Sequence, residues 1–234
     1  MGEVMLEKWS GAVNEVVIGA TKSEGGTRTS SISVGGQKGL PYLFAEGFLP
    51  HKAKIAFEVW DSAPSDWPDA LTGVYGKLLH DPLLWAQECV HKYKAELLCV
   101  RMQAAHPDCG DTTPEESADF IRKLLKKVGV PLIILGCGDD AKDNLVLPAC
   151  CEAARGERCL VGDAMQDNYK TLAAAVMDGR LCSFYWRRTA AGGLHSICVQ
   201  SAQYSFGHRP LSLPAQGLGG SSARFGDGRH GRYF

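Results

Sequence analysis

Several local motifs that mark common functional sites are missing from this sequence. Its nine cysteines include no CxxC pair, so neither a zinc ribbon nor an iron–sulfur cluster held by closely spaced cysteines is expected. There is no P-loop, nucleophile elbow or HExxH motif. The segment GCGDDA lacks the third glycine of a dinucleotide-binding fingerprint, and its two carboxylates would repel a pyrophosphate. We therefore expect no metal site on this chain and no nucleotide fingerprint.

The chain also lacks a long apolar run and a strong net charge. No stretch approaches the roughly 18 apolar residues of a transmembrane helix, and the start MGEVMLEKWSG has no apolar core of a signal peptide. We expect a cytoplasmic protein without membrane contact, whose reduced cysteines mostly pack as small hydrophobes. The net charge of −1 gives no basic field for nucleic acid, which is not expected as a partner.

Lysine and glutamate are absent from residues 178–234. This segment has a net charge of +5, against −6 for residues 1–177, and it shows no sustained period of 2 or 3.6 residues. Three interpretations are open: a disordered tail that binds nucleic acid or an acidic partner, an irregular functional region, or the product of a shifted reading frame. We favour the shifted frame, because out-of-frame reading of G+C-rich codons replaces lysine by arginine.

Strand-like and helix-like segments alternate before that point. Glu15–Ala20 and Ser30–Val34 flank a glycine-containing turn and predict a hairpin. The further strands expected are Lys54–Asp61, Ala95–Met102, Leu132–Cys137 and Cys159–Asp163. A long loop is expected after the first of these strands. Two helices are expected to begin at Pro82 and at Pro114, and two more are expected at Ala141–Ala154 and Asn168–Met177. Strands such as PLIILGC are apolar throughout, which is typical of parallel strands covered on both faces.

Four such units predict an α/β fold of the TIM (β/α)8 barrel family, here with only about the first four βα units and an N-terminal hairpin. A doubly wound open sheet is the alternative, but EVWDSAPSDW does not resemble the Gly-rich loop that normally follows its first strand. We expect three regions: a hairpin segment at 1–53, a partial barrel domain at 54–178, and an irregular, disordered or frame-shifted tail at 179–234.

Polar residues follow each predicted strand and would share one rim of a barrel. They are Glu58, Asp61, Gln103, His106, Asp108, Gly136, Gly138, Asp139, Asp140, Lys142, Asn144, Asp163, Gln166, Asp167, Asn168 and Tyr169. The alternative is structural: Asp139 or Asp140, and Asp167 or Asn168, would cap helices, and His106 would be a turn residue. Glu58 lies inside an apolar strand and is expected to be buried, and a buried carboxylate is costly unless paired. We therefore expect Glu58 to be functional or paired with Lys54 or Arg101.

Several long segments of the sequence resemble a known protein family. NEVVIGATKSEGGTRTSSISVGG, RMQAAHPDCGD, PLIILGCGDDAKDNLVLPACCEAA and AMQDNYKTLAAAVM, together with FEVWD and DWP, are similar to the delta subunit of acetyl-CoA decarbonylase/synthase, the small subunit of the corrinoid/iron–sulfur protein. The resemblance covers about residues 10–177 and implies a TIM barrel. Family members continue with further strand–helix units where this chain changes composition.

The resemblance implies a heterodimer with a large (gamma) subunit, which holds the iron–sulfur cluster, and a cobamide shared between the two. This cobamide carries a methyl group from a methyl-tetrahydropterin to acetyl-CoA synthase in the reductive acetyl-CoA (Wood–Ljungdahl) pathway, with the methyltransferase and the synthase as transient partners. No catalytic residue is assigned, and the chain is not expected to be catalytic alone. The residues implied to face the cobamide are His106, Asp108, Gly136, Gly138, Asp139, Gln166, Asp167 and Asn168. Two alternatives remain, a free-standing pterin-dependent methyltransferase-like barrel and an inactive truncated fragment.

The frame-shift interpretation is tested by the coding DNA. We expect an alternative frame after the codon for Met177 that encodes further strand–helix units. Sequencing of the gene around codon 178 checks this, and a gene with no such frame would rule the interpretation out.

Overall fold

A computed structural model describes residues 14–38, 49–65, 67–165, 168–178 and 183–186. All of these residues belong to one compact unit, Met1–Tyr204, and a second unit, Ser205–Phe234, lies outside the described residues. Within the described residues, no helix has the length and apolar character needed to cross a membrane.

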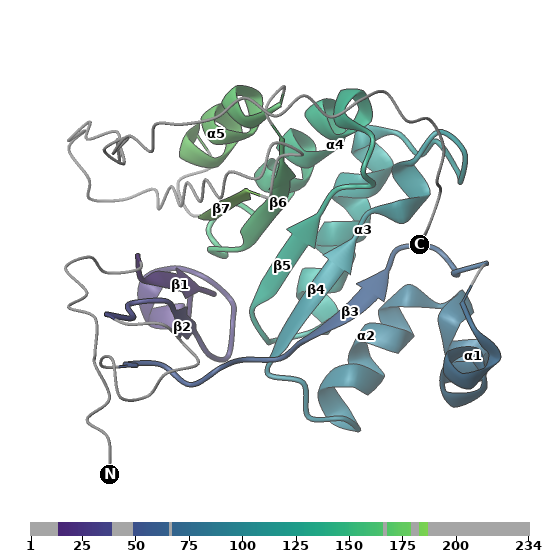
Figure 1. The fold of residues 1–234 in the computed structure, drawn as a ribbon, viewed down its shortest axis with the longest axis horizontal. Helices are drawn as coiled ribbons and strands as arrows, with labels where there is room; N and C mark the ends of the chain where they lie inside the picture. The colour runs from purple at the N-terminus through teal and green to yellow at the C-terminus, as the bar shows by residue number, and fades with distance from the viewer. Residues whose placement is uncertain (1–13, 39–48, 66, 166–167, 179–182, 187–234) are drawn as a thin grey trace, which may run out of the picture. The chain divides into compact units, whose positions relative to one another are not determined.

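One parallel sheet has strands whose order in space follows their order in the chain (Figure 1). Its strands are β3 (Ala56–Trp60), β4 (Leu97–Arg101), β5 (Leu132–Leu135), β6 (Leu160–Ala164) and β7 (Ser183–Trp186). A doubly wound sheet reverses its strand order at a switch point. The described strands show no such reversal, which argues against the doubly wound alternative. The predicted parallel α/β architecture is confirmed.

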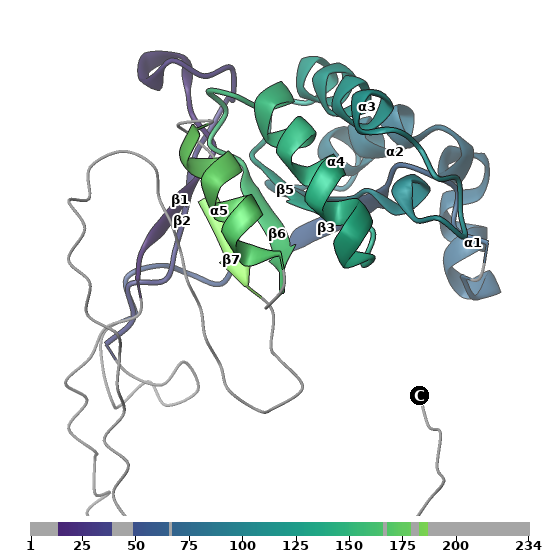
Figure 2. The same ribbon diagram turned by 90° about the horizontal axis from the view of Figure 1, so that it is seen from above.

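Helices connect consecutive strands of this sheet. They are α1 (Asp69–Tyr75), α2 (Pro82–His91), α3 (Pro114–Lys127), α4 (Asp140–Ala153) and α5 (Tyr169–Asp178), with the short 3-10 helices η2 (Gly76–His80) and η3 (Gln103–Ala105). A further 3-10 helix, η1 (Lys22–Glu24), lies in the N-terminal hairpin. Helices α2 to α5 contact one another in chain order and form a row along the strands (Figure 2).

Side-chain caps explain where two of the helices begin. The Asp81 carboxylate accepts a hydrogen bond from the backbone N–H of Leu84 at 3.0 Å, with Pro82 at the first helical position of α2. At α3, Thr113 Oγ1 accepts from the N–H of Glu116 at 3.2 Å, and the Glu116 carboxylate accepts from the N–H of Thr113 at 2.8 Å. This reciprocal capping box confirms the predicted start of α3.

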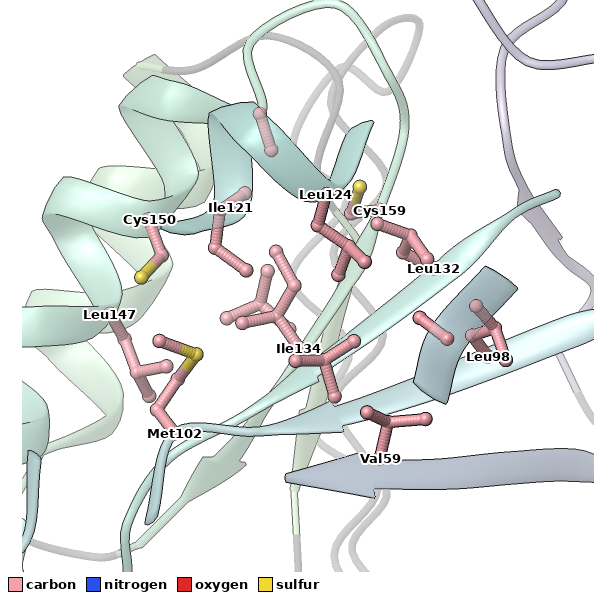
Figure 3. Packing of buried hydrophobic residues seen from close by; sticks show 14 of the residues in the cluster. Val59, Leu98, Met102, Ile121, Leu124, Leu132, Ile134, Leu147, Cys150 and Cys159 are labelled. Carbon is pink, nitrogen blue, oxygen red and sulfur yellow. The ribbon is translucent and has the colours of Figure 1, made fainter. Parts of the chain in front are cut away.

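Alternate strand residues form the core against the helices (Figure 3). Val59, Leu98 and Ile134 are fully buried there, together with Ile121 of α3 and Leu147 of α4. The cysteines expected to pack as small hydrophobes are likewise buried: Cys99, Cys137, Cys150, Cys151 and Cys159. The predicted packing role of these thiols is confirmed.

At the N-terminal ends of the strands, the N-terminal hairpin covers the opposite face of the sheet. Strands β1 (Val16–Ile18) and β2 (Ile32–Val34) pair antiparallel, as predicted. Their apolar side chains pack with Leu97, Ile133 and Leu160. Each of these three residues neighbours in sequence a residue that faces the helices, so it points to the other side. Both faces of β4 are therefore apolar at its N-terminal end, which explains its unbroken apolar sequence.

A buried ion pair fastens the hairpin to the rest of the chain. Arg28 is 2% exposed, and its Nε donates to Glu157 Oε2 at 2.8 Å. Its Nη atoms donate to the carbonyls of Leu125 and Val128, both at 2.6 Å, at the C-terminal end of α3. Glu157 also accepts from the backbone N–H and the hydroxyl of Thr27. The charges of this pair are thus matched and almost fully hydrogen-bonded, as burial requires.

Two predictions of irregular structure are wrong. The segment after the first core strand, expected as a long loop, contains α1 and η2. No side chain of helix α1 is fully buried, and its sequence therefore lacks the apolar stripe that would predict a helix. Beyond residue 178, β7 continues the sheet beside β6, although the tail was expected to be irregular. Residues 187–234 lie outside the described residues.

Removal of the Arg28 guanidinium is expected to destabilise the fold strongly. Arg28→Ala leaves Glu157 buried without its cation and should lower the free energy of unfolding by about 3–5 kcal/mol. Urea denaturation of the full chain measures this. Lys54→Ala is the matched control, because it breaks the more exposed Lys54–Glu96 pair and should therefore cost much less stability than Arg28→Ala. Equal, small losses in both variants would contradict the assigned role of Arg28.

Candidate functional site

The loops at the C-terminal ends of β4, β5 and β6 lie side by side. Backbone bonds join neighbouring strand ends: Met102 N–H donates to the Leu135 carbonyl at 3.0 Å, and Gly136 N–H donates to the Gly162 carbonyl at 2.8 Å. Lys142 at the start of α4 reaches across to Asp111 in the preceding loop, with 2.6 Å between Nζ and Oδ1. The structure therefore brings those predicted rim residues of these loops that it describes to one edge of the sheet, as expected.

His106 is the centre of the hydrogen bonds that shape the β4–α3 loop. Its carbonyl accepts hydrogen bonds from the N–H groups of Cys109, Gly110 and Asp111 at 2.9 to 3.2 Å. Its Nδ1 accepts from the N–H of Asp108 at 3.1 Å, which leaves Nε2 as the nitrogen that carries the proton in the neutral ring. The imidazole is partly exposed, and the Asp108 side chain is 90% exposed. Both side chains can contact a ligand at this edge.

The β5–α4 loop is built around a buried carboxylate, Asp143. It accepts from the N–H of Cys137 at 2.8 Å and from that of Gly138 at 3.1 Å. Burial raises the pKa of Asp143 above its ordinary value. A Cβ added to Gly136 would stand 2.3 Å from this carboxylate, so only glycine fits there. Sequence reasoning missed Asp143; an acid in the first turn of a helix directly after a glycine loop was the available signal.

Gly138 is an open backbone position at the same edge. It is exposed with φ +96°, and a Cβ added to it would meet no heavy atom within 4 Å. Glycine adopts this left-handed conformation without strain. A flat ligand therefore has direct access to the backbone of the loop.

Two predicted site residues have structural bonds. Asp139 caps α4, since its Oδ1 accepts from the N–H of Lys142 at 2.8 Å. Asn168 is fully buried, and its Oδ1 accepts from the N–H of Met165 at 2.6 Å, which shapes the loop before α5. Gln166 and Asp167 lie outside the described residues.

Glu58, Trp60 and Arg101 form a polar cluster at the C-terminal ends of β3 and β4. Glu58 Oε1 accepts from Arg101 Nε at 2.9 Å and from Trp60 Nε1 at 2.7 Å. The expected pairing of Glu58 with Arg101 is confirmed, but its expected burial is wrong, because its side chain is 41% exposed. Burial alone would lower the pKa of Arg101, and the bond and charge of Glu58 raise it overall. Glu58 and Arg101 alternate with Val59 and Val100, so these two side chains lie on the face away from the helices. The ring of Trp60 also packs on Trp67.

Asp61 positions the β4–α3 loop from the end of β3. Its Oδ1 accepts from the N–H of Ala104 at 2.7 Å, within η3. Burial raises the pKa of Asp61 to about 6, against a usual 3.8, and the bond from Ala104 opposes this only in part. Among the described residues, no group of three or more His, Cys, Asp or Glu side chains is arranged to hold a metal ion.

Neutralising Asp61 is expected to change how stability depends on pH. Because its pKa is higher in the folded state, the native protein binds more protons between pH 4 and 6, and stability falls as pH rises through that window. Asp61→Asn keeps an oxygen for the Ala104 N–H and should remove this loss, on the order of 1–2 kcal/mol at pH 7. Urea unfolding at pH 4.5 and 7.5 measures it, with the exposed Asp108→Asn as control. Parallel pH profiles of wild type and Asp61→Asn would contradict the expectation.

Comparison with known proteins identifies the family. A family model described as CO dehydrogenase/acetyl-CoA synthase delta subunit matches residues 15–196, which reaches past the composition change at residue 178 and includes β7. The family resemblance was expected to end near residue 177, but the match extends to residue 196.

Similar curated proteins support the same family assignment. The chain is 35% identical over 176 residues to the acetyl-CoA decarbonylase/synthase complex subunit delta of Methanocaldococcus jannaschii, covering 75% of this chain and 43% of the relative. It is 35% identical over 185 residues to the subunit delta of Methanothermobacter thermautotrophicus (79% and 46%), and 34% over 165 residues to that of Archaeoglobus fulgidus (70% and 36%). The matched part is thus less than half the length of these relatives. The chain belongs to the CO dehydrogenase/acetyl-CoA synthase delta subunit family.

Proposed function

We propose that this chain acts as the small subunit of a corrinoid/iron–sulfur protein, which carries a methyl group between a methyl-tetrahydropterin and acetyl-CoA synthase. The family match over residues 15–196 is the observation that supports this most directly. The proposed stable partner is a large (gamma) subunit, and the methyltransferase and the synthase are transient partners. The proposed compartment is the cytoplasm, and the chain is not catalytic by itself.

The proposed architecture is the first part of a TIM barrel. Five parallel strands follow one another without reversal, and helices α2 to α4 pack on the face of the sheet opposite to the hairpin. In a closed barrel the hairpin face becomes the interior, with Glu58 and Arg101 near its C-terminal mouth. Relatives more than twice as long as the matched segment have ample chain for further strands.

The described rim suits a cobamide as a shared ligand. A corrin is large and flat and carries amide arms, so it needs close backbone approach and polar groups around its margin. Gly138 offers the open backbone, since a Cβ there would fill empty space. His106, Asp108 and Asp139 offer a proton donor and carboxylate acceptors around it. These are the residues that would hold the margin of the ring.

When bound, the cobamide supplies the cobalt that carries the methyl group. The role that remains for this chain is positional: the bonds of Asp143 and Asp61 hold two rim loops in place, and the exposed side chains contact the ligand. We place the iron–sulfur cluster on the large subunit. Free Cys137 and Cys99 are buried, and burial raises the pKa of each thiol to about 12, which disfavours the thiolate that a cluster requires.

Co-expression with the large subunit tests this function. The purified pair is expected to show cobamide absorbance that this chain alone lacks. The double variant His106→Ala/Asp108→Asn should lower the cobamide content of the pair several-fold, because it removes two polar groups from the rim. Glu96→Gln is the matched control: it also neutralises an exposed carboxylate, at the N-terminal side of β4, and should leave cobamide content unchanged.

Other outcomes would favour the alternatives. Methyl transfer from a methyl-tetrahydropterin by this chain alone would indicate a free-standing methyltransferase. No cobamide in a stable pair with the large subunit would contradict the carrier function and indicate an inactive fragment.

A further inference from the structure

A hollow of about 490 Å³ lies at the opposite end of the sheet from the rim. It is formed by the C-terminal ends of α3 and α4, which lead into β5 and β6, and by the hairpin turn at Thr27. Leu125, Val128 and Ala153 supply apolar wall. Arg122, Lys126 and Lys127 line it with positive charge. Its volume lies within the range of small-ligand sites.

The described residues around the hollow do not balance its positive charge. Glu157, the acidic residue of the lining, is already neutralised by Arg28 and accepts three hydrogen bonds. Arg122 pairs with Asp119 on the same helix. Lys126 and Lys127 make no ion pair or hydrogen bond with any described residue. The hollow therefore carries two uncompensated cations beside apolar wall.

A structural role at the helix end does not account for both lysines. Basic residues in a last turn often serve to satisfy the terminal carbonyls and the negative end of the helix dipole. Here Arg28 takes that role, since its Nη atoms bond the carbonyls of Leu125 and Val128. The ammonium groups of Lys126 and Lys127 remain available to a ligand.

We propose that this hollow binds a small phosphate ester with an apolar or aromatic body, of about nucleotide size. The phosphate contacts Lys126 and Lys127, and the body packs on the wall formed by Leu125, Val128 and Ala153. Phosphate binding by lysine is a point-charge interaction, so it needs no fixed fork geometry and weakens with salt. The site lies apart from the cobamide rim and does not rest on the function proposed above.

Titration of the full 234-residue chain with ADP, pyrophosphate and adenosine tests the site. At low ionic strength, calorimetry should show ADP binding more tightly than pyrophosphate, because only ADP uses the apolar wall, and adenosine weakly or not at all. Lys126→Ala/Lys127→Ala should weaken ADP binding by about tenfold or more, as expected for two lost charge-assisted contacts. Lys123→Ala is the matched control: this exposed cation lies on the same helix but outside the hollow, and its loss should change affinity less than about twofold.

Three results would overturn the proposal. The first is no binding of ADP at millimolar concentration by a folded wild-type chain. The second is an equal loss of ADP affinity in Lys123→Ala and in the double variant. The third is tighter binding of an acidic peptide than of ADP. The second would mean diffuse surface charge, and the third would reassign the surface to a protein partner. Thermal unfolding of each variant, expected to match wild type, shows that lost binding is not lost folding. The cobamide content of the pair with the large subunit is expected to stay unchanged in the double variant, so the two proposals fail independently.

Discussion

The buried pair of Arg28 and Glu157 is the constraint on which the arrangement of the described chain depends. It joins three places far apart in sequence: the hairpin turn, the end of α3 and the loop that leads into β6. The attraction of two buried charges is useful only when their other bonds are made, and here Thr27 and the α3 carbonyls make them. With the turn fixed, the apolar side chains of β1 and β2 remain on Leu97 and Ile133 and cover that face at the N-terminal end of the sheet.

The two ends of the sheet are stabilised by different means. At the N-terminal end, charge pairing and apolar contact hold a separate element in place. At the C-terminal end, single carboxylates organise loops from within: Asp143 binds the N–H groups next to Gly136, and Asp61 binds that of Ala104. Burial raises the pKa of each of these acids, because the charged carboxylate is less favourable away from water. Both carboxylates are nevertheless buried, because their hydrogen bonds fix the loops. The exposed groups near them, such as Asp108 and Gly138, are left free for a ligand.

Sequence pattern predicted those elements that carry a local signal. The helix starts at Pro82 and Pro114 and the apolar strands depend on local chemistry, and the structure has them where expected. Helix α1 was missed because a helix with no fully buried side chain has no periodic apolar pattern in its sequence. Glu58 was misjudged because an apolar strand does not reveal that one of its faces opens near the C-terminal end. The pairing of residues 129 positions apart, as in Arg28 and Glu157, is a tertiary fact that no window of sequence contains.

The sequential strand order also dictates an order of assembly. Each βα unit contacts mainly the unit just before it, so the sheet can grow strand by strand as the chain leaves the ribosome. The hairpin is the exception: it precedes the sheet in the sequence, yet its ion-pair partner Glu157 is made about 130 residues later. Until then, the apolar residues of β1 and β2 have no complete surface to cover. The hairpin thus stays unsecured until β5 and α4, which precede Glu157 in the sequence, have been made.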